Sequence, residues 1–162
     1  MTHSHQSTLA PAPGPMRAAG FTLIELMITV VIAAILMSIA FPLYQHQIRE
    51  SRRTDARSAI LDLASREERY YATNNAYTNV AANLGYSGWD VPIGGGYYEI
   101  HQPSNVNPGT ATQAATFTVT AVPLAGKGQD QDSDCQSFTV IQTGQESSTN
   151  AASGDSTATC WK

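Results

Sequence analysis

Residues 21–44 read FTLIELMITVVIAAILMSIAFPLY and decide the fold of this chain. Glu25 is the only charged residue in this stretch. A helix rises 1.5 Å per residue, so a helix of this length can cross the ~30 Å hydrocarbon layer of a bilayer. The sequence therefore predicts a membrane-anchoring helix over residues 21–44.

The segment before the anchor, residues 1–20, is polar and rich in Pro and Ala, with Arg17 as its only formal charge. Its small residues, Ala18-Ala19-Gly20, precede the apolar stretch, whereas an ordinary secretory signal places its cleavage site after the apolar region. Cleavage after Gly20 would leave the anchor on the mature chain. The sequence leaves open whether translation starts at Met1 or at Met16.

Residues 20–26, GFTLIEL, resemble the prepilin peptidase site of type IV pilins and of the related secretion pseudopilins. The resemblance implies cleavage after Gly20 and methylation of the new Phe21 amine. It also implies the α+β lollipop fold of pilins, in which a long N-terminal helix packs on a three- to four-stranded antiparallel sheet. The chain would be a prepilin in the inner membrane of a Gram-negative bacterium and then part of an extracellular pilus.

Glu25 is a candidate assembly residue, because an ionisable group inside an apolar anchor is costly and marks a functional site. The structural alternative is that Glu25 simply benefits from the helix dipole near the helix start. In the pilin assembly scheme that the resemblance implies, Glu25 pairs with the Phe21 amine of a neighbouring subunit. Pro42 removes one helical hydrogen bond, and we expect a kink or local melting there rather than the end of the helix.

Residues 45–73 are predicted to continue the helix with one apolar face, because apolar residues recur there at spacings of three and four. That face comprises Ile48, Ala56, Ala59, Ile60, Leu63, Ala64, Tyr70 and Tyr71. The opposite, polar face is expected to carry the charges: Arg49, Arg52, Arg53, Arg57, Arg66 and Arg69 with Glu50, Asp55, Asp62, Glu67 and Glu68. The first four arginines could bind nucleic acid, but contact with lipid headgroups or with acidic groups of neighbouring subunits is the stronger interpretation. The stretches 51–56 and 66–71 resemble the PilE-type group of minor pilins.

The remaining residues, 74–162, are predicted to form a globular head. Residues 74–96 lack a period and read as a long loop, and the Gly94-Gly95-Gly96 run lacks the spacing of a phosphate-binding loop. Residues 97–101, 115–122 and 137–141 alternate or carry β-branched side chains, so they are expected to form an antiparallel meander.

Cys135 and Cys160 are candidates for a disulfide that closes a C-terminal loop, which an exported chain can form. Asp130, Asp132 and Asp134 resemble the start of a calcium loop, but the glycine and the glutamate that an EF-hand requires are missing. No cofactor is therefore expected, with a looser calcium site at these three residues as the weaker alternative. The histidines are isolated and offer no catalytic set, so we expect no enzyme.

The function that the resemblance implies is a structural one: a pilin, of the PilE-like minor type, that assembles through its N-terminal helix into a type IV pilus for twitching, adhesion or DNA uptake. Its expected partners are other pilin subunits, the prepilin peptidase, and the assembly platform and motor. The alternatives are a type II secretion pseudopilin and a DNA-binding competence pilin. Nucleic acid is an unlikely partner on charge grounds, because the net charge is −4 and residues 74–162 carry seven acids against Lys127 and Lys162.

Overall fold

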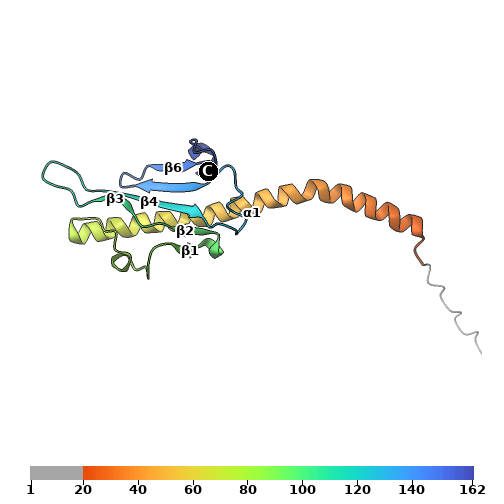
Figure 1. Ribbon diagram of the computed structural model, residues 1–162, viewed down its shortest axis with the longest axis horizontal. Helices are drawn as coiled ribbons and strands as arrows, with labels where there is room; N and C mark the ends of the chain where they lie inside the picture. The colour runs from red at the N-terminus through yellow and green to blue at the C-terminus, as the bar shows by residue number, and fades with distance from the viewer. Residues whose placement is uncertain (1–19) are drawn as a thin grey trace, which may run out of the picture. The chain divides into compact units, whose positions relative to one another are not determined.

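The computed structural model describes residues 20–162, which form two compact units divided between Phe41 and Pro42. The first unit is the apolar, N-terminal part of helix α1, and the second contains the rest of α1 and the head (Figure 1). Helix α1 spans Leu23–Asn74 as one element of 52 residues. The helix that the sequence predicted over residues 21–73 is therefore confirmed, and it begins two residues later.

The head contains a sheet of six strands, β1 Val91–Ile93, β2 Tyr98–Ile100, β3 Ser104–Asn107, β4 Thr116–Pro123, β5 Ser137–Ile141 and β6 Glu146–Thr149. All of the pairings are antiparallel, in the order β1-β2-β4-β5-β6, with β3 also paired to β4. The three predicted strands correspond to β2, β4 and β5. The expected count of three to four was too low, because β1, β3 and β6 are short and rich in residues that also form loops.

Strands β2 and β3 lie end to end along the same side of β4. Ile100 pairs with Ala121, and Ser104 pairs with Thr118, so one extra residue is accommodated between the two strands. Pro103 lies in this gap and cannot donate a ladder hydrogen bond, which explains why one long strand is divided into two.

The outer edges of the sheet are closed in two different ways. At one side, β1 is only three residues long and contains the exposed Pro92. At the other side, the chain folds back on β6: Asp155 forms a bridge with Thr149, and the Ser156 N–H donates to the Ser148 carbonyl at 3.0 Å. The short helix α2, Thr157–Cys160, follows directly.

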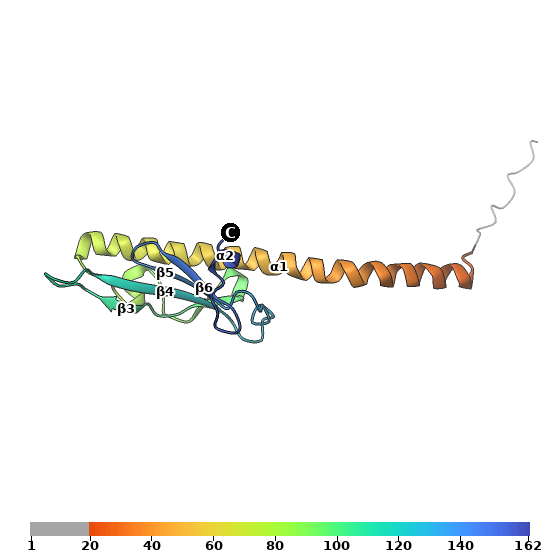
Figure 2. The ribbon, with the colours of Figure 1, turned by 90° about the horizontal axis from the view of Figure 1, so that it is seen from above.

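The core of the head lies between the second half of α1 and the inner face of the sheet, as the two views of the ribbon show (Figure 2). Strand β4 alternates strictly, with Phe117, Val119 and Ala121 pointing inward. The helix contributes Ala56, Ile60, Leu63 and Ala64, all of which the sequence assigned to this face. Two short 3₁₀ turns, η1 Ala81–Leu84 and η2 Gly94–Gly96, lie in the connection that was predicted to be an irregular loop.

Candidate functional site

The apolar part of α1 has no protein covering it in the described chain. Every residue from Gly20 to Tyr44 is exposed, including Phe21 at 82% and Leu43 at 67%. The most apolar 18 residues of the helix have a mean hydropathy of 2.6, so the helix is long and apolar enough to cross a membrane. Burial of this surface in lipid or against other helices is strongly favourable.

Phe21 and Glu25 lie at the start of this helix. The Thr22 hydroxyl accepts a hydrogen bond from the Glu25 N–H at 3.3 Å, so Thr22 satisfies one of the free donors at the helix start. Among the described residues, no basic group lies within ion-pair distance of the Glu25 carboxylate. Gly20 precedes the helix, while Ala18, Ala19 and the alternative start at Met16 lie outside the described residues.

Pro42 lies inside α1, and the helix continues for a further 32 residues to Asn74. The expectation that Pro42 does not end the helix is therefore correct. Its ring still removes one backbone hydrogen bond from the ladder. Local melting at Pro42 in an assembled fibre stays a prediction.

The disulfide between Cys135 and Cys160 is present, with both residues fully buried. It closes a loop of 25 residues that contains β5, β6 and α2. The three aspartates that precede it do not converge. Asp130 accepts the Gly126 N–H at 3.0 Å, Asp132 is buried, and the described part of the chain contains no cluster of three metal-ligating side chains.

Asp132 instead forms a buried ion pair with Arg53 of α1. Arg53 donates from Nε to Oδ2 and from Nη2 to Oδ1, both at 2.7 Å. Gln129 donates to Asp132 at 3.1 Å and to the Tyr98 hydroxyl at 2.9 Å, which completes a buried polar network. The hydrogen bond and charge of Asp132 raise the pKa of Arg53, so the pair stays charged. The assignment of Arg53 to the polar face of the helix was therefore wrong.

The neighbouring arginines are also used within the head. Arg57 donates to the carbonyls of Cys160 and Lys162 and approaches Glu50 at 3.3 Å. The Arg52 guanidinium lies 3.5 Å from the centre of the Tyr97 ring. Arg52, Arg53 and Arg57 thus have partners inside one subunit, and a role of these arginines toward lipid or neighbouring subunits stays a prediction.

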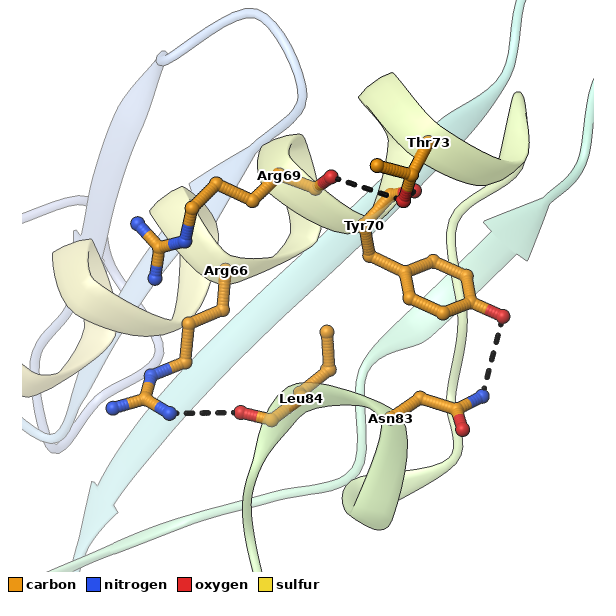
Figure 3. Close-up of a pocket in the computed structure, with 6 residues that line it drawn as sticks. All are labelled: Arg66, Arg69, Tyr70, Thr73, Asn83 and Leu84. Atoms are coloured by element: carbon orange, nitrogen blue, oxygen red, sulfur yellow. Dashed lines mark hydrogen bonds between the residues drawn. The ribbon is translucent and has the colours of Figure 1, made fainter.

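A second group of cations lines a pocket of about 280 Å³ between α1 and the η1 turn (Figure 3). Its lining consists of Arg66, Arg69, Tyr70 and Thr73 from the helix and Asn83 and Leu84 from η1. Asn83 donates its side-chain amide to the Tyr70 hydroxyl at 3.3 Å, and Arg66 donates to the Leu84 carbonyl at 2.9 Å (Figure 3). Arginine, amide and hydroxyl groups are the donors that bind phosphate oxygens.

Arg66 is held in place from three sides. Asp62, one helical turn earlier, forms an ion pair with it at 2.7 Å, and the Leu84 carbonyl accepts a hydrogen bond from Nη1 of Arg66. The guanidinium lies 5.1 Å from the Tyr86 ring centre, and Tyr86 lies 5.9 Å from Trp89. Arg69 is exposed and donates to Ser65 at 2.6 Å. The pocket thus has one fixed cation, with the Tyr86 ring near it, and one more open cation.

Glu67 was also assigned to the polar face, and this too was wrong: its side chain is fully buried. Its Oε2 atom accepts the Thr78 N–H at 3.1 Å, while Oε1 has no partner among the described residues. Burial raises the pKa of Glu67 to about 7, although the Thr78 N–H opposes the shift. The spacing of residues 53, 56, 60, 63 and 67 was the signal that could have placed both Arg53 and Glu67 on the buried face.

A long helix with an uncovered apolar N-terminal part, followed by an antiparallel sheet with a disulfide-closed C-terminal region, defines a type IV pilin. The chain belongs to the family described as type IV minor pilin ComP, DNA uptake sequence receptor, whose model matches residues 42–139, more than half of the chain. The prokaryotic N-terminal methylation motif matches residues 15–41. A search of curated proteins gave no match.

These matches confirm the prediction of a type IV minor pilin. The chain is a membrane-anchored prepilin that becomes a pilus subunit. The same matches favour a pilin over the alternative of a type II secretion pseudopilin.

Proposed function

We propose that this minor pilin is cleaved after Gly20, methylated at Phe21 and inserted into a fibre with Glu25 paired to the Phe21 amine of a neighbouring subunit. The supporting observation is that Glu25 is exposed on an uncovered apolar helix and has no ion-pair partner among the described residues. A charge in such a place needs a counter-charge once the helix is surrounded by other apolar helices. The setting is the inner membrane of a Gram-negative bacterium.

Mass spectrometry of surface fibres sheared from the native cells tests this proposal. An N-methylated Phe21 peptide in the fibre fraction supports it, and its low abundance relative to the other subunits is expected of a minor pilin. Glu25→Ala should leave the chain in the membrane and remove it from the fibres. Glu68→Gln is the control, because Glu68 lies in the second half of α1, outside the apolar part. An uncut N-terminus, or normal incorporation of Glu25→Ala, would refute the scheme.

The second candidate function is DNA capture by the head. Net charge argues against nucleic acid, but two observations favour it: the family description names a DNA uptake sequence receptor, and two arginines, Arg66 and Arg69, line the pocket of Figure 3. Residues 74–162 are acidic overall, so the α1 side of the head is where a phosphate backbone meets the least repulsion.

In this scheme Arg66 and Arg69 each neutralise a DNA phosphate. The Tyr70 hydroxyl, which accepts the Asn83 amide, can donate its own proton to another oxygen of the DNA backbone. Asp62 and Leu84 orient Arg66 before DNA arrives, which lowers the entropy lost on binding. Tyr86 lies beside Arg66, with the Trp89 ring next to that of Tyr86, and these rings offer apolar surface to a sugar or to an exposed base.

Fluorescence anisotropy of the full chain in detergent micelles with labelled duplex DNA tests this second function. The double variant Arg66→Gln/Arg69→Gln should reduce the slope of log affinity against log salt by about two, since each phosphate contact contributes about one. The control Arg49→Gln/Lys127→Gln removes the same charge elsewhere and should change affinity less. An equal loss in both double variants would show that net charge alone is responsible, and no binding by the unmodified chain would end the DNA proposal.

A further inference from the structure

We propose that the protonation state of Glu67 controls the Arg66–Arg69 pocket. When the Glu67 carboxyl is protonated, residues 78–84 stay packed on α1. When it ionises, these residues move away from the helix and DNA binding weakens. This inference deepens the proposed DNA function and rests on it for the binding readout. The observations that carry it are the complete burial of Glu67 and a chain of hydrogen bonds that joins it to the pocket.

The hydrogen bonds run through Thr78. Glu67 Oε2 accepts the Thr78 N–H at 3.1 Å, and the Thr78 hydroxyl accepts from the Asn83 amide at 3.2 Å. The same Asn83 amide reaches the Tyr70 hydroxyl at 3.3 Å on the pocket wall. Thr78 also accepts the Val80 N–H, so it holds together the segment that leads into η1. Movement of Thr78 away from Glu67 therefore moves a wall of the pocket.

The reason for such movement is the second oxygen of Glu67. Oε1 is buried with no hydrogen-bond partner among the described residues, a situation that a neutral carboxyl tolerates and an ionised one does not. The free-energy cost of the buried, ionised carboxylate is lowered most easily if water enters under residues 78–84. That segment is a connection, which opens at a lower free energy than the strands of the core.

The charges around Glu67 act in the same direction. The charge of Glu68, on the same helix, raises the pKa of Glu67. In the connection, the ionisable group that interacts with the charge of Glu67 is the Tyr77 hydroxyl, which donates to Glu68 at 2.9 Å. The strand packed on this part of the helix presents Phe117, Val119 and Ala121, which are uncharged. Ionised Glu67 would also place a negative charge one residue from Arg66, which reduces the attraction for phosphate.

DNA affinity of the full chain in micelles, measured from pH 5.5 to 8.5 at fixed ionic strength, tests the inference. We expect affinity to fall on the order of tenfold across this range, the size of a typical coupling between sites. Glu67→Gln should keep the low-pH affinity at every pH. The matched control Glu68→Gln changes an exposed neighbour and should keep the fall, as should His101→Gln, which replaces a histidine outside residues 78–84.

Hydrogen exchange of the amides in residues 78–84 separates a failure of this inference from a failure of the DNA proposal. Protection factors, corrected for the intrinsic pH dependence of exchange, should drop above pH 7 in the unmodified chain and stay constant in Glu67→Gln. If DNA binds but its pH dependence survives in Glu67→Gln, the control by Glu67 is refuted. If DNA does not bind at any pH, the coupling to DNA is refuted together with the DNA function, and the exchange data then decide whether the segment itself responds to Glu67.

Discussion

Arg53 and Asp132 form a two-hydrogen-bond ion pair that joins helix α1 to the segment leading into the disulfide-closed loop. Both donor–acceptor distances are 2.7 Å, and the two side chains are 4% and 1% exposed. The residues are 79 positions apart in sequence, so the pair fixes the helix and the C-terminal part of the head to each other. Because both side chains are buried, removal of one partner leaves the other charged and unpaired inside the protein, which is costly.

Loss of Asp132 should therefore be strongly destabilising. Asp132→Asn leaves Arg53 charged and buried, and we expect a loss of about 3–5 kcal/mol in the free energy of unfolding. Urea unfolding of the full chain in micelles, followed by near-ultraviolet circular dichroism, measures this. Asp134→Asn is the control, since the Asp134 side chain is 55% exposed and lies 3.4 Å from Arg53. Similar losses for both variants would contradict a special role for Asp132.

Glu67→Gln should stabilise the head in a pH-dependent way. The folded-state pKa of Glu67, about 7, lies above the ordinary value of 4.5, so its contribution to stability is full below pH 4.5 and is lost as the pH rises to about 7. A neutral glutamine avoids this loss. The variant should match the unmodified chain near pH 4.5 and exceed it by about 2–3 kcal/mol at pH 8. Thermal unfolding at the two pH values is the measurement, and a difference that does not depend on pH would contradict it.

Reduction of the Cys135–Cys160 disulfide should lower the free energy of unfolding by about 3–4 kcal/mol, on the chain-entropy estimate for a loop of this size. Unfolding curves with and without a reductant report the loss. The Cys135→Ser/Cys160→Ser variant should be equally destabilised and should no longer respond to reductant. Unchanged curves on reduction would show that the loop is held by its other contacts.

Gly109 and Gly128 provide a matched pair of glycine substitutions. Both have positive φ, +83° and +79°, so alanine is strained at either position. An added Cβ at Gly109 would lie 2.9 Å from the Ala115 backbone nitrogen, whereas at Gly128 it would meet open space. Gly109→Ala should therefore lower the unfolding temperature more than Gly128→Ala. Equal shifts would indicate that the β3–β4 connection adjusts to the extra methyl group.

Much of this architecture follows from local sequence patterns. The apolar run that begins at Phe21 predicts the helix, and the alternation around Phe117 predicts the longest strand. The same reasoning fails where long-range pairing overrides residue type. Arg53 and Glu67 share the helical spacing of the apolar face, but because they are charged they were assigned to the solvent-facing side. Their burial depends on hydrogen bonds with Asp132 and Thr78, which lie outside the helix and which the helical pattern does not predict.

The short strands illustrate the same limit. β3, with the sequence Ser-Asn-Val-Asn, carries the composition of a turn and becomes a strand because β4 offers it a free edge beyond Pro103. The pocket of Figure 3 could not be predicted either, because it requires η1 to lie against the helix, whose lining residues precede those of η1 by ten or more positions in the chain.

The closed edges of the sheet affect how such heads behave when they are crowded together. Within residues 20–162, Pro92 on one side and residues 155–157 beside β6 on the other leave only the four-residue β3 with an unpaired outer edge that another chain could extend. Heads packed at fibre density are thus protected from fusing into a continuous cross-β aggregate. Contacts between heads then depend on side chains rather than on shared backbone pairing, so they leave the fold of each head unchanged.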